Sequence, residues 1–225
     1  MRFQSSLEYY TVFIMKFTRR TGRTAVRIIA LIWLNGAALG AEVSNPPAPY
    51  SESVAQHRLK RDAFLRESPQ SPFRATPGVQ FSPLKYFPPN RSWVFRSTLH
   101  LYETPEAVTI FDTKGRKREG VIFGYLTFSR EGRSHLLRIY RMPGPGGNAH
   151  YAIWFTDQTT GSTTYEVGRY LDFEKSDDPG HNYTIDFNLA YNPYCAYSPA
   201  YGCAVPRKED RLDLAITAGE KKWHD

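Results

Sequence analysis

The sequence has little cysteine and no apolar segment of membrane-spanning length. Its two cysteines, Cys195 and Cys203, are separated by seven residues rather than by the paired C-x-x-C spacing of structural zinc sites. The apolar run from Ile28 to Leu34 is much shorter than the roughly 20 residues that a spanning helix needs. No repeat recurs at a fixed period. These absences argue against a metal site, a helical membrane anchor and a repeat architecture.

A strong charge imbalance is also absent once the first 41 residues are set aside. The chain carries 29 Lys and Arg against 22 Asp and Glu, a formal net charge of +7. Residues 1–41 hold six of the basic and one of the acidic residues, so subtraction leaves 23 basic and 21 acidic groups, a net of +2. Nucleic-acid-binding domains concentrate positive charge on one face. The single compact basic run, 114–118, is predicted as a hairpin turn, so we expect no nucleic-acid partner.

Residues 1–41 have the organisation of an export signal. Basic residues between 16 and 27 precede the apolar run, and small residues follow it, which predicts cleavage near Gly40 or Ala41. No cysteine lies near this point, so we expect no lipid anchor. The sequence predicts a periplasmic or secreted protein.

Two details of this signal stay open. Arg19 and Arg20 are compatible with a twin-arginine signal, and the general secretory route is the alternative. The sequence from Met15 onward begins as an export peptide normally begins, whereas the residues before it do not. Met15 is therefore a candidate for the true start.

A linker and one helix are predicted to follow the signal. Residues 42–50 are rich in proline and serine, which is typical of a linker. Good helix formers continue to residue 67, with Ser51 or Ser53 as the expected N-cap. The apolar positions form only a narrow stripe, so the helix is predicted to be peripheral.

From Ser92 onward apolar and polar residues alternate with a period of two. About eight short segments rich in β-branched and aromatic residues are separated by hairpin-sized connectors. A succession of this kind predicts a mainly β protein. We expect residues 51–225 to form a single antiparallel barrel or sandwich-like domain with one peripheral N-terminal helix, since both arrangements avoid a long exposed edge.

Three unusual strings occur in a specific order: "FTDQTTGSTTYEVGRYLDF" (155–173), "DFNLAYNPYCAYSPAYGC" (186–203) and "RLDLAITAGEKKW" (211–223). In these strings the chain resembles the bacterial and archaeal family catalogued as domain of unknown function 1684. The resemblance covers roughly residues 71–223. Thr163, Ala204 and Asp210 depart from the residues common in the family. The resemblance implies no reaction.

Polar residues at strand ends suggest one pocket. Asp186 lies on the polar face of a predicted strand, and Asp157 begins a turn after another strand. An arginine can clamp a carboxylate or phosphate, and tyrosines provide flat apolar contact. The side chains expected to converge are Asp157, Tyr165, Arg169, Asp186, Asn188, Tyr191, Asn192 and Glu220. Such a pocket would bind a polar small molecule or a cell-envelope component.

Two alternatives remain beside binding. A hydrolase could use Asp157 or Asp186 as general acid/base, because two carboxylates in one pocket shift each other's pKa. In a structural or interaction module, the same residues would cap turns and satisfy buried backbone groups. We expect no cofactor, and the oligomeric state is not determined by the sequence.

The two cysteines of an exported chain favour a disulfide. A Cys195–Cys203 link would close a short loop and stabilise the fold by about 2.5 kcal/mol. A metal site with His181 is one competing interpretation. A cysteine nucleophile with His181 or His150 as base is another. No local motif marks either histidine.

Overall fold

The computed structural model describes residues 49–224. The predicted signal peptide over 1–41 and residues 42–48 of the predicted linker lie outside the described residues. None of the described helices has the length and apolar character needed to cross a membrane.

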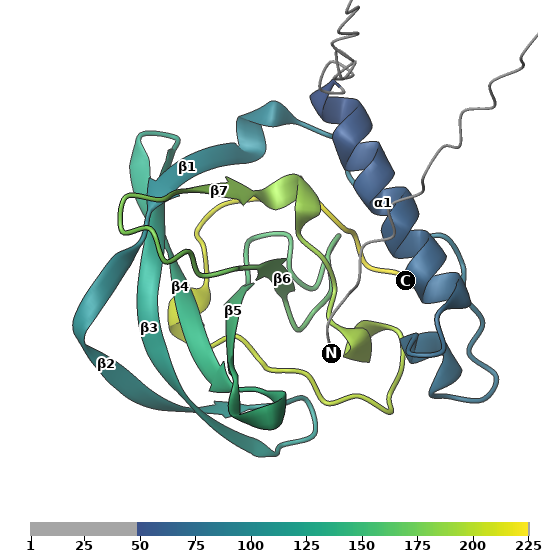
Figure 1. Ribbon diagram of the computed structural model, residues 1–225. Helices are drawn as coiled ribbons and strands as arrows, with labels where there is room; N and C mark the ends of the chain where they lie inside the picture. The colour runs from purple at the N-terminus through teal and green to yellow at the C-terminus, as the bar shows by residue number, and fades with distance from the viewer. Residues whose placement is uncertain (1–48, 225) are drawn as a thin grey trace, which may run out of the picture. The chain divides into compact units, whose positions relative to one another are not determined.

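Residues 49–224 form seven antiparallel strands and one long helix (Figure 1), which confirms a mainly β protein with one N-terminal helix and gives one strand fewer than the roughly eight expected. The strands are β1 (Val94–Thr98), β2 (His100–Phe111), β3 (Lys117–Arg130), β4 (Arg133–Pro143), β5 (Ala149–Phe155), β6 (Arg169–Asp172) and β7 (Asn182–Asp186). Strands β2 to β6 pair in sequence order as a five-stranded meander, and β1 pairs with β7. Within the described residues the sheets do not close, so the expected barrel is not confirmed.

The meander follows from apolar residues at every second position. In β3 the side chains of Leu126 and Phe128 are buried between partly exposed neighbours. They pack in the main core with Ile139 of β4. Glu131 and Gly132 join β3 to β4 with φ angles of 53° and 71°. This left-handed backbone matches the twist of a tight hairpin.

Strands β1 and β2 follow each other closely in the chain but belong to different sheets, since β1 pairs with β7 and β2 pairs with β3. The Ser97 hydroxyl near the end of β1 accepts the Thr127 N–H of β3 at 2.9 Å, while β1 pairs along its length with β7. The sequence predicts that β7 continues to residue 190, but it ends at Asp186. The Asp186 carboxylate accepts the Asn188 N–H at 2.9 Å and so caps a 3₁₀ turn.

The C-terminal segment corrects another expected strand. Residues 211–217 alternate apolar and polar side chains, and Leu212, Leu214 and Ile216 are buried in the main core. The segment belongs to neither sheet and makes only isolated bridges, such as Thr156 with Arg211. Its backbone carbonyls bind an arginine side chain instead, as described below.

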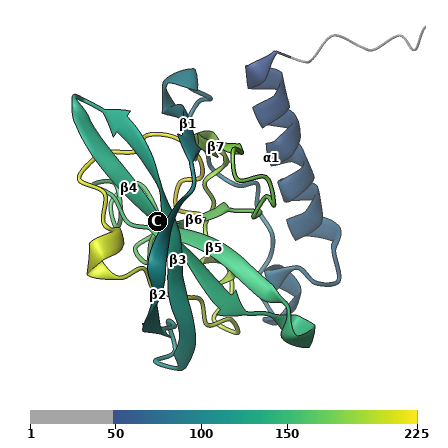
Figure 2. The ribbon, with the colours of Figure 1, turned by 60° about the vertical axis from the view of Figure 1, so that its left-hand side comes forward.

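Helix α1 (Tyr50–Glu67) lies beside the sheets (Figure 2). Only two of its side chains, Val54 and Leu65, are buried, which confirms a peripheral helix. The helix begins directly after Pro49, and neither of the two expected serines caps it.

Polar contacts also attach α1 to the rest of the domain. Arg61 Nε lies 3.3 Å from Glu220 Oε2, and its Nη2 donates to the Asn192 carbonyl at 3.1 Å. The guanidinium also lies 4.6 Å from the centroid of the Tyr191 ring. The Glu220 side chain is fully buried, so Arg61 is its cationic partner inside the protein.

We expect Arg61→Ala to lower the free energy of unfolding by about 3–5 kcal/mol, because the buried Glu220 carboxylate would lose its partner. Urea denaturation measures this change. Lys60→Ala, at the exposed neighbouring position of α1, is the matched control and should change stability little. Equal stability of the two variants would show that the ion pair does not hold the helix.

Candidate functional site

The eight residues expected in one pocket lie in several polar clusters and do not line one cavity. Most of them are buried, and each cluster is completed by side chains or carbonyls from distant segments. The first two clusters described below touch where Arg169 Nη1 donates to the Glu220 carbonyl at 3.4 Å. The expectation of a single open pocket lined by all eight is therefore wrong.

Arg169 and Asp157 form a buried ion pair. Arg169 Nη2 lies 2.7 Å from Asp157 Oδ2 and donates to the Ile216 carbonyl at 2.9 Å. Its Nη1 donates to the Ala218 carbonyl. The other carboxylate oxygen of Asp157 accepts both the N–H and the hydroxyl of Thr159, at 2.6 and 2.5 Å. Both side chains are at most 1% exposed, so the pair has no open face for a ligand.

A second cluster surrounds Glu220. Its carboxylate accepts the Asn192 N–H at 3.1 Å and the Asn192 side-chain amide at 3.0 Å, and the Tyr197 hydroxyl also donates to it. Burial raises the pKa of the Glu220 carboxyl, which Arg61 opposes, and burial likewise raises the pKa of Tyr197. The sequence missed Tyr197 and Arg61, because no local pattern separates them from other tyrosines and helix arginines.

A third cluster joins β7 to the start of α1. The Tyr50 hydroxyl donates to both oxygens of Asp186 at 2.9 Å. The Asn188 amide donates to Asp186 and to the Asn90 carbonyl, both at 2.9 Å. These bonds fix the chain after β7 and join it to Tyr50, the first residue of α1.

The two tyrosines of the expected set lie apart. Tyr191 donates its hydroxyl to Asp172 at 2.7 Å. The Tyr165 hydroxyl points instead to Cys195 Sγ, 3.6 Å away. Tyr165 therefore shares no cluster with the other expected residues.

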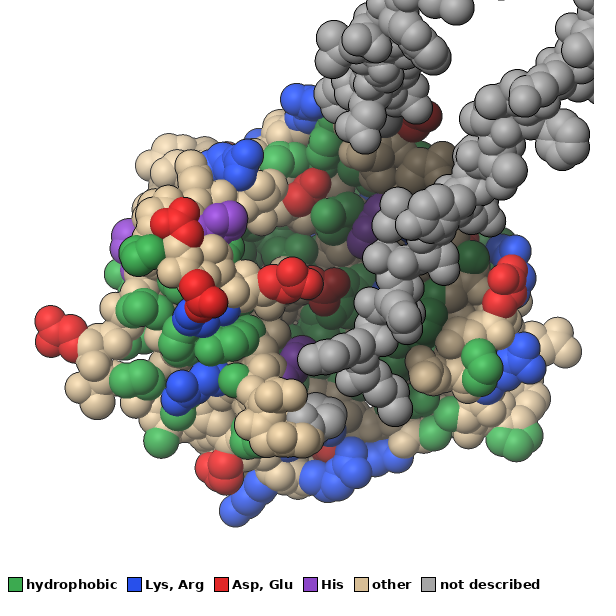
Figure 3. All heavy atoms as spheres, viewed as in Figure 1, with side chains coloured by type: hydrophobic (Ala, Val, Ile, Leu, Met, Phe, Trp, Pro, Cys, Tyr) green, Lys and Arg blue, Asp and Glu red, His purple; other side chains and the backbone are tan. Residues whose placement is uncertain are grey.

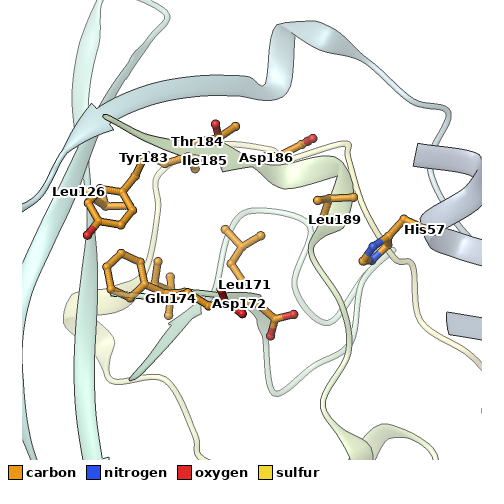
Figure 4. A pocket seen from close by; sticks show the side chains of 12 residues that line it. His57, Leu126, Leu171, Asp172, Glu174, Tyr183, Thr184, Ile185, Asp186 and Leu189 are labelled. Carbon is orange, nitrogen blue, oxygen red and sulfur yellow. The ribbon is translucent and has the colours of Figure 1, made fainter. Parts of the chain in front are cut away.

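A different site is present between β6, β7 and α1. A cavity of about 250 Å³ opens there (Figure 4), and Figure 3 shows a recessed apolar area with acidic side chains beside it. Its apolar wall is formed by Leu126, Ile153, Leu171, Phe173, Tyr183, Ile185 and Leu189. Its polar lining consists of His57, Asp172, Glu174, Thr184 and Asp186. Asp186 is the only member of the expected set that lines it.

The charge at this cavity is negative. Three carboxylates line it, and partial burial together with the nearby Arg61 lowers the pKa of His57, which disfavours a positive charge on the imidazole. Asp172 and Asp186 accept hydrogen bonds from tyrosine hydroxyls, which leave their negative charge in place. Sequence reasoning missed this site because its walls are ordinary core residues.

Residues 49–224 contain no group of three or more His, Cys, Asp or Glu side chains arranged to hold a metal ion. Cys195 and Cys203 are adjacent but carry free thiols in the structure. The Cys195 N–H donates to Cys203 Sγ at 3.2 Å. The disulfide between them stays a prediction.

We expect Arg169→Ala to lower the free energy of unfolding by about 3–5 kcal/mol, because Asp157 would be left as a buried unpaired charge. Chemical denaturation gives the value. Arg133→Ala removes one partner of the exposed pair with Asp213 and should have little effect. A stable Arg169→Ala protein would contradict a structural role.

Comparisons with known proteins give a family and a related fold. The family model described as "Protein of unknown function (DUF1684)" matches residues 79–221. The chain is similar to the uncharacterized protein from gene locus rrnAC0354 of Haloarcula marismortui, solved by solution NMR. The two are 32% identical with a TM-score of 0.57, over 76% of this chain and 92% of that chain. No curated protein matches. The family model covers well over half of the chain, which confirms the resemblance: this protein belongs to the DUF1684 family.

Proposed function

We propose that this domain binds a small molecule with an apolar body and a positively charged group, in the cavity between β6, β7 and α1. The observation that carries the proposal is the combination of an apolar wall with three carboxylates around one cavity. Ligand sites in proteins typically combine an apolar lining with a few placed polar groups. The carboxylates would bind the cation, and the wall would exclude water from the apolar part.

The size of the cavity limits the ligand. An apolar cavity of about 150 Å³ accommodates benzene, and typical drug-sized sites begin at about 300 Å³. A volume of about 250 Å³ therefore suits a single ring or a short branched chain. The charged group would lie toward Asp172 and Glu174, whose carboxylates provide the opposite charge and can accept charge-assisted hydrogen bonds.

The carboxylates of the cavity favour a cationic ligand. The sequence suggests an anionic one, bound by Arg169. Arg169 is enclosed by Asp157 and backbone carbonyls and does not line the cavity. Binding also has more support than hydrolysis. Asp157 has both oxygens engaged, and Asp186 is held by Tyr50 and caps a turn.

The test uses three probes that share one ring: cyclohexylmethylamine, cyclohexylmethanol and cyclohexanecarboxylate. We expect the amine to raise the melting temperature most, the alcohol less and the carboxylate not at all. Isothermal titration calorimetry gives the affinities. Glu174→Gln should weaken amine binding and leave alcohol binding unchanged, and Glu103→Gln on β2 is the matched control.

A cavity-filling variant separates this site from others. Leu189→Trp should abolish the response to the amine, because the indole would occupy the cavity. Leu101→Trp, at an exposed position of β2, should leave the response intact. An equal amine response in both tryptophan variants would refute the proposed site. Failure of every probe on the wild-type chain would favour a structural module.

We also propose that the protein is exported, to the periplasm or out of the cell. The support is the basic and apolar organisation of residues 1–41. Expression of the full chain in a bacterial host should give a processed protein outside the cytoplasm, beginning at residue 41 or 42 by amino-terminal sequencing. An unprocessed chain confined to the cytoplasm would contradict export. In a precursor blocked in processing, sequencing would also distinguish a start at Met1 from one at Met15.

A further inference from the structure

The two cysteines are brought together by a loop that returns on itself. Cys195 lies in a 3₁₀ turn (Tyr194–Ala196), and its backbone N–H donates to Cys203 Sγ at 3.2 Å. The Cys203 N–H in turn donates to the Thr113 hydroxyl at 3.2 Å, which holds this end of the loop against the β2–β3 turn. Both side chains are partly exposed.

Each cysteine opens onto a cavity of its own. Cys203 lines a cavity of about 230 Å³ walled by Trp154 and Tyr191. Cys195 lines another of about 500 Å³, together with Tyr165 and Trp223. The cavity at Cys195 shares no residue with the ligand site proposed above. A reagent can therefore reach Cys195 without passing through that site.

The surroundings distinguish the two sulfurs. The Cys203 thiol and, more weakly, the Tyr165 hydroxyl 3.6 Å away donate to Cys195 Sγ, and they lower the pKa of Cys195 to about 7 although burial opposes this. The same thiol–thiol hydrogen bond, together with burial, raises the pKa of Cys203. Arg118 is the cation that acts on Cys203, and Glu166 lies near Tyr165. In the geometry, Cys195 Sγ faces the Tyr165 hydroxyl and lines the larger of the two cavities, whereas Cys203 Sγ accepts the Cys195 N–H.

We propose that Cys195 and Cys203 form a reversible dithiol–disulfide couple, in which Cys195 is the attacking thiol and Cys203 the resolving thiol. The Cys195 thiolate attacks one sulfur of a disulfide RSSR, whose S–S bond breaks and releases RS⁻, which takes a proton from water. Cys203 then loses its proton and attacks Cys195 Sγ in the mixed disulfide. The second RS⁻ leaves and is protonated. Two cysteines are oxidised to one disulfide, and RSSR is reduced to two RSH.

Two properties favour reversible thiol–disulfide exchange over a permanent disulfide: both cysteines are partly exposed, and one thiol is suited to attack. Exposed disulfides are the labile ones, and an attacking thiol is most effective when its pKa lies near the ambient pH. In the reverse reaction Tyr165 would donate a hydrogen bond to the Cys195 thiolate as it leaves. Tyr165 thus has a positioning role here, whereas it has no part in the other clusters.

The first experiment titrates the full-length chain in glutathione buffers of increasing oxidation and follows it by mass spectrometry. We expect the loss of two hydrogen atoms over the titration and full recovery of the thiols with dithiothreitol under native conditions. A link that resists native dithiothreitol, or thiols that stay reduced in oxidised glutathione, would overturn the proposal.

The second experiment assigns the two roles. With Cys203→Ser, oxidised glutathione should trap a mixed disulfide on Cys195 about fivefold faster than Cys195→Ser traps one on Cys203, as the thiolate fraction and nucleophilicity together predict. Tyr165→Phe added to Cys203→Ser should slow trapping, whereas Tyr201→Phe, a tyrosine of the same loop, should not. Equal trapping rates for the two serine variants in the folded state would refute the assignment. Rates in urea give the reference for unstructured thiols.

Discussion

The Arg169 guanidinium joins the five-stranded sheet to the C-terminal segment, which belongs to neither sheet. The C-terminal segment 211–220 has no strand ladder, so its carbonyls need donors from elsewhere. Arg169, at the start of β6, donates to the carbonyls of Ile216 and Ala218, and Asp157 balances its charge. An arginine suits this role because its planar guanidinium has five donors in fixed directions. Because these bonds fix the C-terminal segment, its alternate apolar residues pack in the core, and Glu220 lies where Arg61 of α1 can reach it.

The position of α1 depends on the position of Glu220. Arg61 binds Glu220, and Tyr50 binds Asp186 at the end of β7, so polar groups attach the helix in addition to the buried Val54 and Leu65. Buried charges are costly unless they are paired and hydrogen-bonded. The geometry meets this requirement at Asp157 and Glu220, which each accept at least three hydrogen bonds. These residues have the composition of a binding site, but most of their polar groups bind one another. Among the described residues, Arg169 Nε and Asn192 Oδ1 are buried without a hydrogen-bond partner.

The cavity results from incomplete closure of the sheets. Strand β6 is only four residues long, and on its outer side it makes one bridge, from Tyr170 to Tyr191. Strand β6 does not pair with β7, and core side chains such as Leu171 and Ile185 line the cavity between the two strands. His57 of α1 lies at this opening, so attachment of the helix and the shape of the cavity are linked.

The sequence alone determined the mainly β class, most of the strands, the peripheral helix and the family, because period-two alternation, propensity and turn residues act over a few neighbouring positions. It also identified Asp157, Arg169, Asn192 and Glu220 as unusual polar residues near strand ends. Only the tertiary structure decided their partners, since Ile216, Ala218 and Arg61 reach them from distant segments. The same limit applies to residues 211–217, whose alternation is satisfied by packing without a ladder. The cavity was beyond sequence reasoning altogether, because a space is defined by where strands separate and not by the residues that line it.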